Sequence, residues 1–86
     1  MQTKELVKDI KQLAKENRDY VISLRRHFHQ YPELSMEEYE TSKKVKEELD
    51  KMGIEYRSAA GTGIIATIKG DKPGKTIALR ADMDAL

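Results

Sequence analysis

An apolar stripe with the period of an α-helix runs through the first third of the chain and stops at a proline. Its members recur at steps of three, four and seven residues, namely Leu6, Ile10, Leu13, Tyr20, Leu24, Phe28 and Tyr31. This spacing predicts one long amphipathic helix from Thr3, its N-cap, to about Gln30. Pro32 ends the helix because the residue before a proline is pushed out of helical geometry. Asn17 lies on the stripe and is the expected weak point.

The length of this helix bears on the size of the domain. A helix of about 28 residues is roughly 42 Å long at about 1.5 Å per residue. An independent globule of 86 residues has a diameter of only about 30 Å, from a radius of gyration of ~12 Å. The helix would therefore overhang its own domain. Together with the abrupt stop after Ala85-Leu86, this predicts that the chain is the first part of a longer protein.

A second helix is indicated after Pro32. Ser35 and Glu38 have the spacing of a capping box, and Gly53 is a left-handed C-cap. A buried stripe is predicted from the helical spacing of Tyr39, Ser42, Val45, Leu49 and Met52.

From residue 54 onward the pattern becomes that of β-strands. Residues 54–56 alternate, and residues 64–68 and 76–79 are rich in β-branched and apolar side chains. The loop 70–74 predicts a hairpin between the last two strands. Because these apolar runs are continuous, both faces of the strands are expected to be covered. The fold class is therefore α/β, with two N-terminal helices followed by a sheet that contains a β-hairpin.

Composition excludes several kinds of partner. The net charge is only +1, spread as +3 over residues 1–30, −3 over 31–53 and +1 over 54–86, and aromatic residues are few. A nucleic-acid binder is expected to show a dominant basic face, and no apolar run approaches the ~18 residues of a membrane span. We therefore expect no nucleic-acid or membrane partner and a cytoplasmic location. Cysteine is absent, which excludes disulfides and a thiol nucleophile within these residues.

His27, His29 and Glu33 are candidate functional residues around the predicted helix end. On a helix, positions i and i+2 lie about 200° apart, so the two imidazoles cannot bind one ion. We interpret the histidines as structural, either capping carbonyls or packing against Tyr31, with a role near a site as the alternative. Glu33 is interpreted as a carboxylate near a helix N-terminus, because catalytic use would need an acid or base partner that is not evident.

Asp82 and Asp84 form the most suggestive pair of carboxylates. They follow an apolar strand and share one face if the extended conformation continues. Such a pair suits a hard cation, or support for a metal-bound histidine, although ordinary surface aspartates explain the pattern equally well. Two carboxylates are too few to hold Mg²⁺ or Zn²⁺. We therefore assign no metal ligand within the chain.

Several motifs together resemble a known family. Residues 24–35, LRRHFHQYPELS, resemble the signature near the start of aminoacylase-type metal-dependent amidohydrolases. This family includes hippurate hydrolases, N-acetyl-diaminopimelate deacetylases and auxin-conjugate hydrolases, and shares the fold of zinc-carboxypeptidase-like metallopeptidases. The resemblance covers about residues 6–86 and continues in order through Glu37-Glu38, Gly61-Thr62-Gly63 and the closing LRADMDAL at 79–86. The residues that match the opening signature include His27, His29, Pro32 and Glu33.

The resemblance implies a fold and an activity. Residues 1–86 would be the N-terminal part of a three-layer α/β/α catalytic domain, with the rest of that domain and a lid or dimerisation domain outside them. The whole protein would hydrolyse N-acyl amino acids to an amino acid and a carboxylic acid, as a homo-oligomer. Two divalent ions (zinc, manganese, nickel or cobalt) would activate water, with a glutamate as general base.

The resemblance also implies which residues lie near the metal. The family's ligands come from a Cys-Gly-His segment, a Glu-Glu pair and two further histidines, all of which lie beyond this segment. Related peptidases have an HxD segment where this chain has Asp82 and Asp84. Asp82 replaces the ligand histidine there, so Asp84 is expected to support the site without binding the ion. The chain alone is expected to bind no metal and to be inactive.

A different class of function remains open from the residues. The stripe from Leu6 to Leu24 can be interpreted as alternating d and a positions of a coiled coil, with Asn17 as a polar residue that sets the register. The chain would then be a non-catalytic helical dimerisation module.

Overall fold

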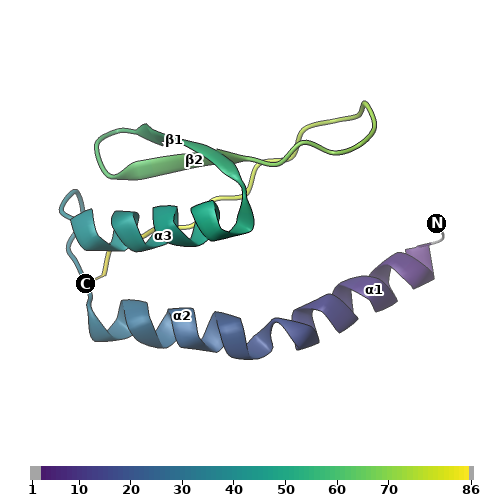
Figure 1. The fold of residues 1–86 in the computed structure, drawn as a ribbon, viewed down its shortest axis with the longest axis horizontal. Helices are drawn as coiled ribbons and strands as arrows, with labels where there is room; N and C mark the ends of the chain where they lie inside the picture. The colour runs from purple at the N-terminus through teal and green to yellow at the C-terminus, as the bar shows by residue number, and fades with distance from the viewer. Residues whose placement is uncertain (1–2, 86) are drawn as a thin grey trace. The chain divides into compact units, whose positions relative to one another are not determined.

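The computed structural model describes residues 3–85 as three helices and one two-stranded sheet (Figure 1). The elements are α1 (Thr3–Glu16), α2 (Arg18–Gln30), α3 (Tyr39–Met52), β1 (Glu55–Ala59) and β2 (Gly63–Thr67). The chain divides into two compact units, one up to Tyr31 and the other from Pro32 onward.

The first unit contains two helices where the sequence predicted one. Asn17 separates α1 from α2, which meet at a bend in Figure 1. Its backbone N–H and its side-chain Nδ2 both donate to the Leu13 carbonyl, at 3.1 and 2.8 Å. The backbone bond is the regular helical one, and the side chain adds a second donor to the same carbonyl. The φ of −94° and ψ of 5° of Asn17 lie outside the helical region. One continuous helix was therefore wrong, and the break falls at the expected weak point.

The apolar stripe of the first unit remains exposed along α1. Its exposed members include Leu6, Ile10 and Leu13. The bend at Asn17 interrupts the straight seam on which a coiled coil depends, so the dimerisation hypothesis stays a prediction. Within the described residues no helix is both long and apolar enough to cross a bilayer.

The second unit begins with an irregular loop that leads into α3. The helix starts at Tyr39, and its N-cap residue Glu38 makes no side-chain capping hydrogen bond. The capping box predicted from Ser35 and Glu38 was therefore wrong. Met36 explains the failure, because its φ of +66° places a left-handed residue between the two members of the box.

The other end of α3 agrees with the prediction. Gly53 adopts the left-handed conformation, with a φ of +70°. Its N–H donates to the Asp50 carbonyl (3.1 Å), and the N–H of Ile54 donates to the Leu49 carbonyl (3.0 Å). This is the paired hydrogen bonding of a Schellman motif. The predicted buried stripe is only partly formed, because Ser42 is buried while Tyr39 and Met52 are exposed.

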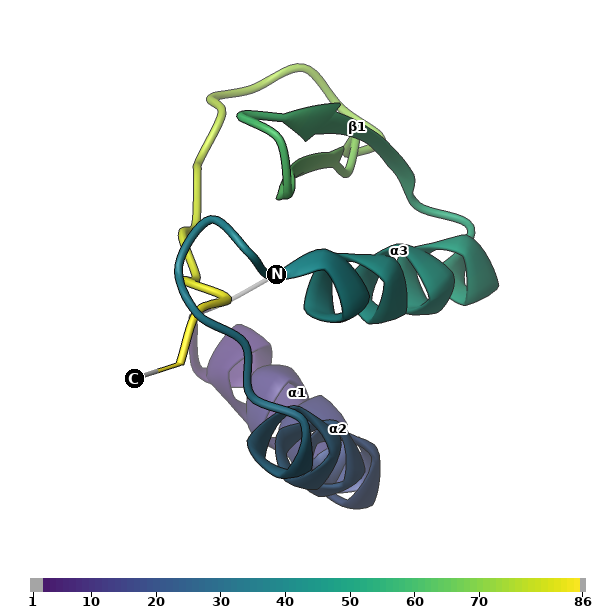
Figure 2. The same ribbon diagram turned by 90° about the vertical axis from the view of Figure 1, so that its left-hand side faces the viewer.

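The sheet is an antiparallel hairpin of β1 and β2 that lies over α3 (Figure 2). The register runs from Glu55 opposite Thr67 to Ala59 opposite Gly63. The phenol of Tyr56 donates to Asp50 Oδ2 of α3 at 3.2 Å.

The hairpin forms between the first two predicted strands, whereas the sequence predicted it between the second and the third. The predicted strands at 54–56 and 64–68 are present as β1 and β2, but they pair with each other, and residues 76–79 form no strand. In the described residues no apolar side chain is buried, and Leu79 is 97% exposed. Coverage of the strands on both faces was therefore wrong for this part of the chain. Residues 76–79 form no strand because a strand requires hydrogen bonds to a neighbouring backbone, and these residues pair with neither β1 nor β2.

The backbone of the hairpin turn is strained at Ala60, and this strain can be tested by substitution. This alanine has a φ of +51°, and the left-handed conformation costs a residue with a Cβ about 1–2 kcal/mol. We expect Ala60→Gly to raise the free energy of unfolding by about 0.5–1 kcal/mol, the relief being partly offset by glycine's greater backbone entropy. Urea denaturation followed by circular dichroism measures the change. Ala59→Gly in β1 is the control and should lower stability; a loss with Ala60→Gly would contradict the strain.

Candidate functional site

The side chain of Glu33 caps the helix that follows it. Its Oε1 accepts hydrogen bonds from the backbone N–H of Thr41 and from Thr41 Oγ1, both at 2.6 Å, and its Oε2 accepts the N–H of Glu40 at 3.2 Å. A carboxylate is well suited to these free N–H groups and to the positive end of the helix dipole. The prediction of a carboxylate near a helix N-terminus is thus confirmed, with Glu33 acting in place of Ser35.

The same hydrogen bonds favour the ionised form of Glu33. The Thr41 hydroxyl is the main cause that holds the pKa of Glu33 below its ordinary value of 4.5, and the N–H groups of Thr41 and Glu40 act in the same direction. Glu33 is therefore a carboxylate at neutral pH and below, engaged in structure and not poised to carry a proton.

This pKa shift predicts a pH-dependent stability. Because the folded-state pKa lies below the unfolded one, the contribution of the carboxylate is fully present above about pH 4.5 and is lost as the pH falls through the lower folded value. The difference in unfolding free energy between wild type and Glu33→Gln should therefore be constant from pH 7 to about 5 and shrink below that. Urea denaturation across pH measures it. A difference that persists unchanged into acid would contradict the shift, and Glu37→Gln, an exposed carboxylate in the same loop, is the matched control.

A second carboxylate ties α3 to the hairpin turn. Thr62 Oγ1 donates to Glu38 Oε2 at 2.6 Å, and both residues are buried, at 8% and 7% exposed. The bond joins the Glu37-Glu38 motif to the Gly61-Thr62-Gly63 motif. Both motifs stand out in the sequence, but neither their contact nor the part played by Thr41 was predicted from it. The available signal for Thr62 was a hydroxyl placed between two glycines, where a turn brings it close to another element.

Asp82 and Asp84 lie in the last described segment, which has no regular secondary structure. In Figure 1 this yellow segment runs back behind α3 to the loop that precedes the helix. Asp82 Oδ1 accepts a hydrogen bond from Arg80 Nε at 3.0 Å, and both side chains are exposed. The N–H of Ala85 donates to the carbonyl of Glu33 at 2.7 Å. The residue after Asp84 is thus anchored to the opening signature, while the role of the two aspartates stays a prediction.

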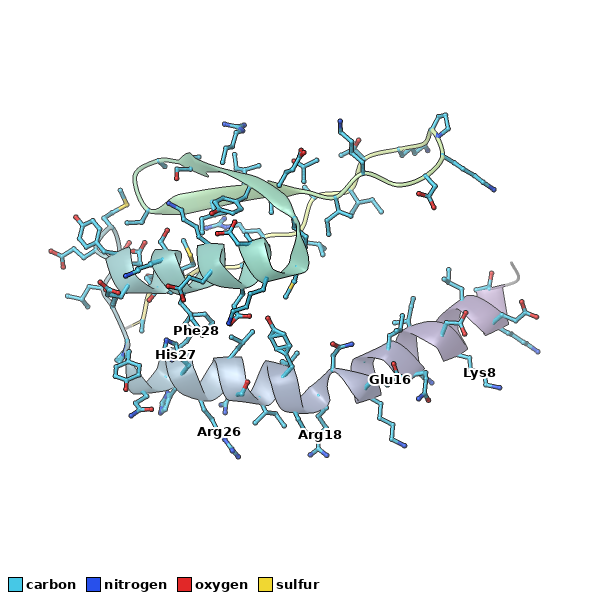
Figure 3. The ribbon with its side chains drawn as sticks, viewed as in Figure 1. Lys8, Glu16, Arg18, Arg26, His27 and Phe28 are labelled. Atoms are coloured by element: carbon cyan, nitrogen blue, oxygen red, sulfur yellow. The ribbon has the colours of Figure 1, made fainter. Side chains whose placement is uncertain are left out.

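The two histidines lie on the last turns of α2, in the first unit. The His27 ring contacts Phe28 edge-on, with 5.6 Å between centroids, and packs against Tyr31 at 5.1 Å, which is one of the structural contacts predicted for it. Phe28 and Arg26 project from opposite sides of the helix (Figure 3). Pro32 follows the C-cap residue Tyr31, whose N–H donates to the His27 carbonyl at 3.1 Å.

The acidic and histidine side chains do not converge on an ion within residues 3–85. In that part of the chain, no three His, Asp or Glu side chains are grouped so that they could hold a metal. Within the second unit, the structure instead links the end of the opening signature, the Glu37-Glu38 motif, the Gly61-Thr62-Gly63 motif and the closing segment through Glu33 and Glu38. Their contacts to Thr41, Thr62 and Ala85 form a hydrogen-bonded framework, which we call the carboxylate framework.

Comparison with known proteins identifies relatives over most of the chain. No protein-family model and no solved structure matches it. It is 51% identical over 84 residues to thermostable carboxypeptidase 1 of Saccharolobus solfataricus, a match that covers 95% of the chain and 21% of the relative. It is 54% identical over 67 residues to the N-acetyl-L-cysteine deacetylase of Bacillus subtilis, covering 77% of the chain and 16% of the relative.

A third relative extends the range of named activities. The N-acyl-L-amino acid amidohydrolase of Geobacillus stearothermophilus is 44% identical over 79 residues, covering 91% of the chain and 21% of the relative. The chain spans about a fifth of the length of the curated relatives it matches. Over most of its residues, therefore, the chain is homologous to the amidohydrolases and carboxypeptidases that include the aminoacylases and the IAA-amino acid hydrolases.

Proposed function

We propose that the protein to which this chain contributes is a metal-dependent amidohydrolase that cleaves N-acyl amino acids into an amino acid and a carboxylic acid. The chain would form the N-terminal part of its three-layer catalytic domain. The observation that carries the proposal is the similarity to the N-acetyl-L-cysteine deacetylase and the N-acyl-L-amino acid amidohydrolase, over 67 and 79 residues of the chain.

In this proposal the chain supplies structure to the site and not its metal ligands. The described residues offer no group of three donors to an ion, and the carboxylates of Glu33 and Glu38 are engaged with Thr41 and Thr62. The residues present therefore do not make a metal site by themselves. Asp84 is assigned the support of ligands that other parts of the protein would contribute.

The assay compares two substrate classes on the complete gene product. N-acetyl and N-benzoyl amino acids test the amidohydrolase activity, and N-blocked dipeptides test a carboxypeptidase activity like that named for the Saccharolobus relatives. We expect release of free amino acid from the first class and its loss after treatment with a chelator. Cleavage of dipeptides alone would assign the carboxypeptidase reaction instead.

Measurements on the 86-residue chain by itself test directly whether the metal ligands and the activity lie outside it. We expect it to bind neither zinc nor manganese at stoichiometric levels in isothermal titration calorimetry. We also expect it to release no amino acid from the same substrates. Tight binding of two ions by the chain alone would show that the ligands lie within it and would overturn the assignment above.

A further inference from the structure

Glu33 makes hydrogen bonds from both its side chain and its backbone, to two segments far apart in sequence. The carboxylate holds the first turn of α3 through Glu40 and Thr41. The carbonyl accepts the N–H of Ala85 at 2.7 Å. Since Ala85 directly follows Asp84, this carbonyl fixes the backbone one peptide away from the carboxylate that the proposed function places beside the metal site.

The geometry around Glu33 leaves its carbonyl little freedom to turn. Three donors from two consecutive residues hold the two carboxylate oxygens. Pro32 restricts the backbone on one side because its ring fixes φ. On the other side, the carbonyl of Leu34 accepts the N–H of Glu37 at 3.0 Å. The side chain of Glu33 and the backbone on both sides of it are therefore restrained. We infer that the hydrogen bonds of the carboxylate to α3 orient the Glu33 carbonyl.

We propose that Glu33 is a positioning residue that sets the place of Asp84. Its carboxylate binds the first turn of α3, and its carbonyl, oriented by that bond, anchors Ala85. The catalytic meaning of this placement rests on the proposed function, whereas the anchoring itself does not.

A plain helix cap would behave differently from a positioning residue. Loss of a cap weakens α3 and everything packed on it, so protection of backbone amides should fall evenly over the second unit. Loss of a positioning residue has an uneven effect. The Ala85 N–H should lose protection together with those of Glu40 and Thr41, and should lose more of it than the hydrogen-bonded amides of β1 and β2 do.

Amide hydrogen exchange in the complete gene product, followed by NMR, separates these outcomes. Glu33→Ala removes the carboxylate that accepts the hydrogen bonds of Glu40 and Thr41 but leaves the backbone carbonyl. Glu33→Gln keeps one side-chain oxygen that can accept from Thr41. Gly61→Ala is the matched control, because a Cβ at a φ of +79° strains the hairpin turn without contacting Glu33 or Ala85. It lowers the stability of the unit from elsewhere.

We expect Ala85 to exchange about tenfold faster in Glu33→Ala, the effect of losing a typical hydrogen bond, with a clearly smaller change in the amides of β1 and β2. Glu33→Gln should recover most of the Ala85 protection, and Gly61→Ala should affect the hairpin amides first. Unchanged exchange at Ala85 in Glu33→Ala would overturn the proposal. An even loss over the whole unit would overturn it too.

Catalysis by the complete gene product provides a second readout. Glu33→Ala should lower kcat on N-acyl amino acids by roughly 10–100-fold, as small misplacements of catalytic groups do, with KM changed less than about threefold, and Glu33→Gln should restore much of kcat. Equal kcat in Glu33→Ala and wild type would overturn the positioning role. A wild-type protein inactive on these substrates would contradict the proposed function instead, and the exchange result then decides the anchoring.

Discussion

Gly63→Ala is expected to lower the free energy of unfolding by about 2–3 kcal/mol, the cost of forcing atoms into a filled space. A Cβ at this position would lie 2.5 Å from the carbonyl oxygen of Ala59 and 3.5 Å from its carbonyl carbon. Ala59 and Gly63 are opposite each other at the closed end of the hairpin. Because the obstacle is backbone in a paired strand, it cannot move away without disturbing the register.

The matched control for this prediction is Gly74→Ala. It adds the same methyl group at a glycine that has no neighbour within 4 Å and no positive φ. Urea denaturation of the two variants therefore isolates the contribution of the close approach from the general effect of replacing a glycine. If Gly63→Ala were as stable as Gly74→Ala, the tight packing of the hairpin end would be refuted.

Thr62→Val is expected to cost about 2 kcal/mol, since it leaves a buried polar group without its partner. Valine keeps the shape of threonine but removes the hydroxyl that donates to Glu38 at 2.6 Å. Both residues are buried, so water does not readily take the place of the hydroxyl. Thr67→Val, an exposed position of the same hairpin, is the control and should change stability by less than about 0.5 kcal/mol.

A double-mutant cycle tests whether the cost comes from this pair. Glu38→Leu removes the carboxylate, so adding Thr62→Val to it should cost much less than Thr62→Val alone. We expect a coupling energy of about 1 kcal/mol or more between the two positions. Thermal or urea unfolding of the four proteins gives this number. Simple additivity would show that the hydrogen bond contributes little to the fold.

Local signals in the sequence predicted where α2 and α3 end. Gly53 and Pro32 act within one or two residues of themselves, through backbone conformation alone, and both predictions were confirmed. The capping of α3 was misassigned because its carboxylate comes from Glu33, eight residues before Thr41. Ser35 had the better local spacing, but the left-handed conformation of Met36 is invisible in a spacing pattern.

Contacts between residues far apart in the sequence could not be predicted from local patterns. The β propensity of residues 64–68 does not indicate whether they pair with the strand before them or with the segment after them. Their pairing with residues 55–59 depends on the turn at Ala60 and Gly61, where both residues have a positive φ. The candidate site shows the same division. Glu33 was correctly placed at a helix N-terminus, whereas the contact of Glu38 with Thr62, 24 residues away, has no periodic or motif signature.

The carboxylate framework also has an order in time. Its links differ in their span along the chain: Glu33–Thr41 is the shortest, Glu38–Thr62 is longer and Glu33–Ala85 is the longest. The entropic cost of closing a loop grows with its length, so we expect the short link to form first and the widest last. On the ribosome, Glu33 can cap α3 once Thr41 has emerged, but its carbonyl must wait for Ala85. We therefore expect Glu33 to take part in both the first and the last of these three links to form.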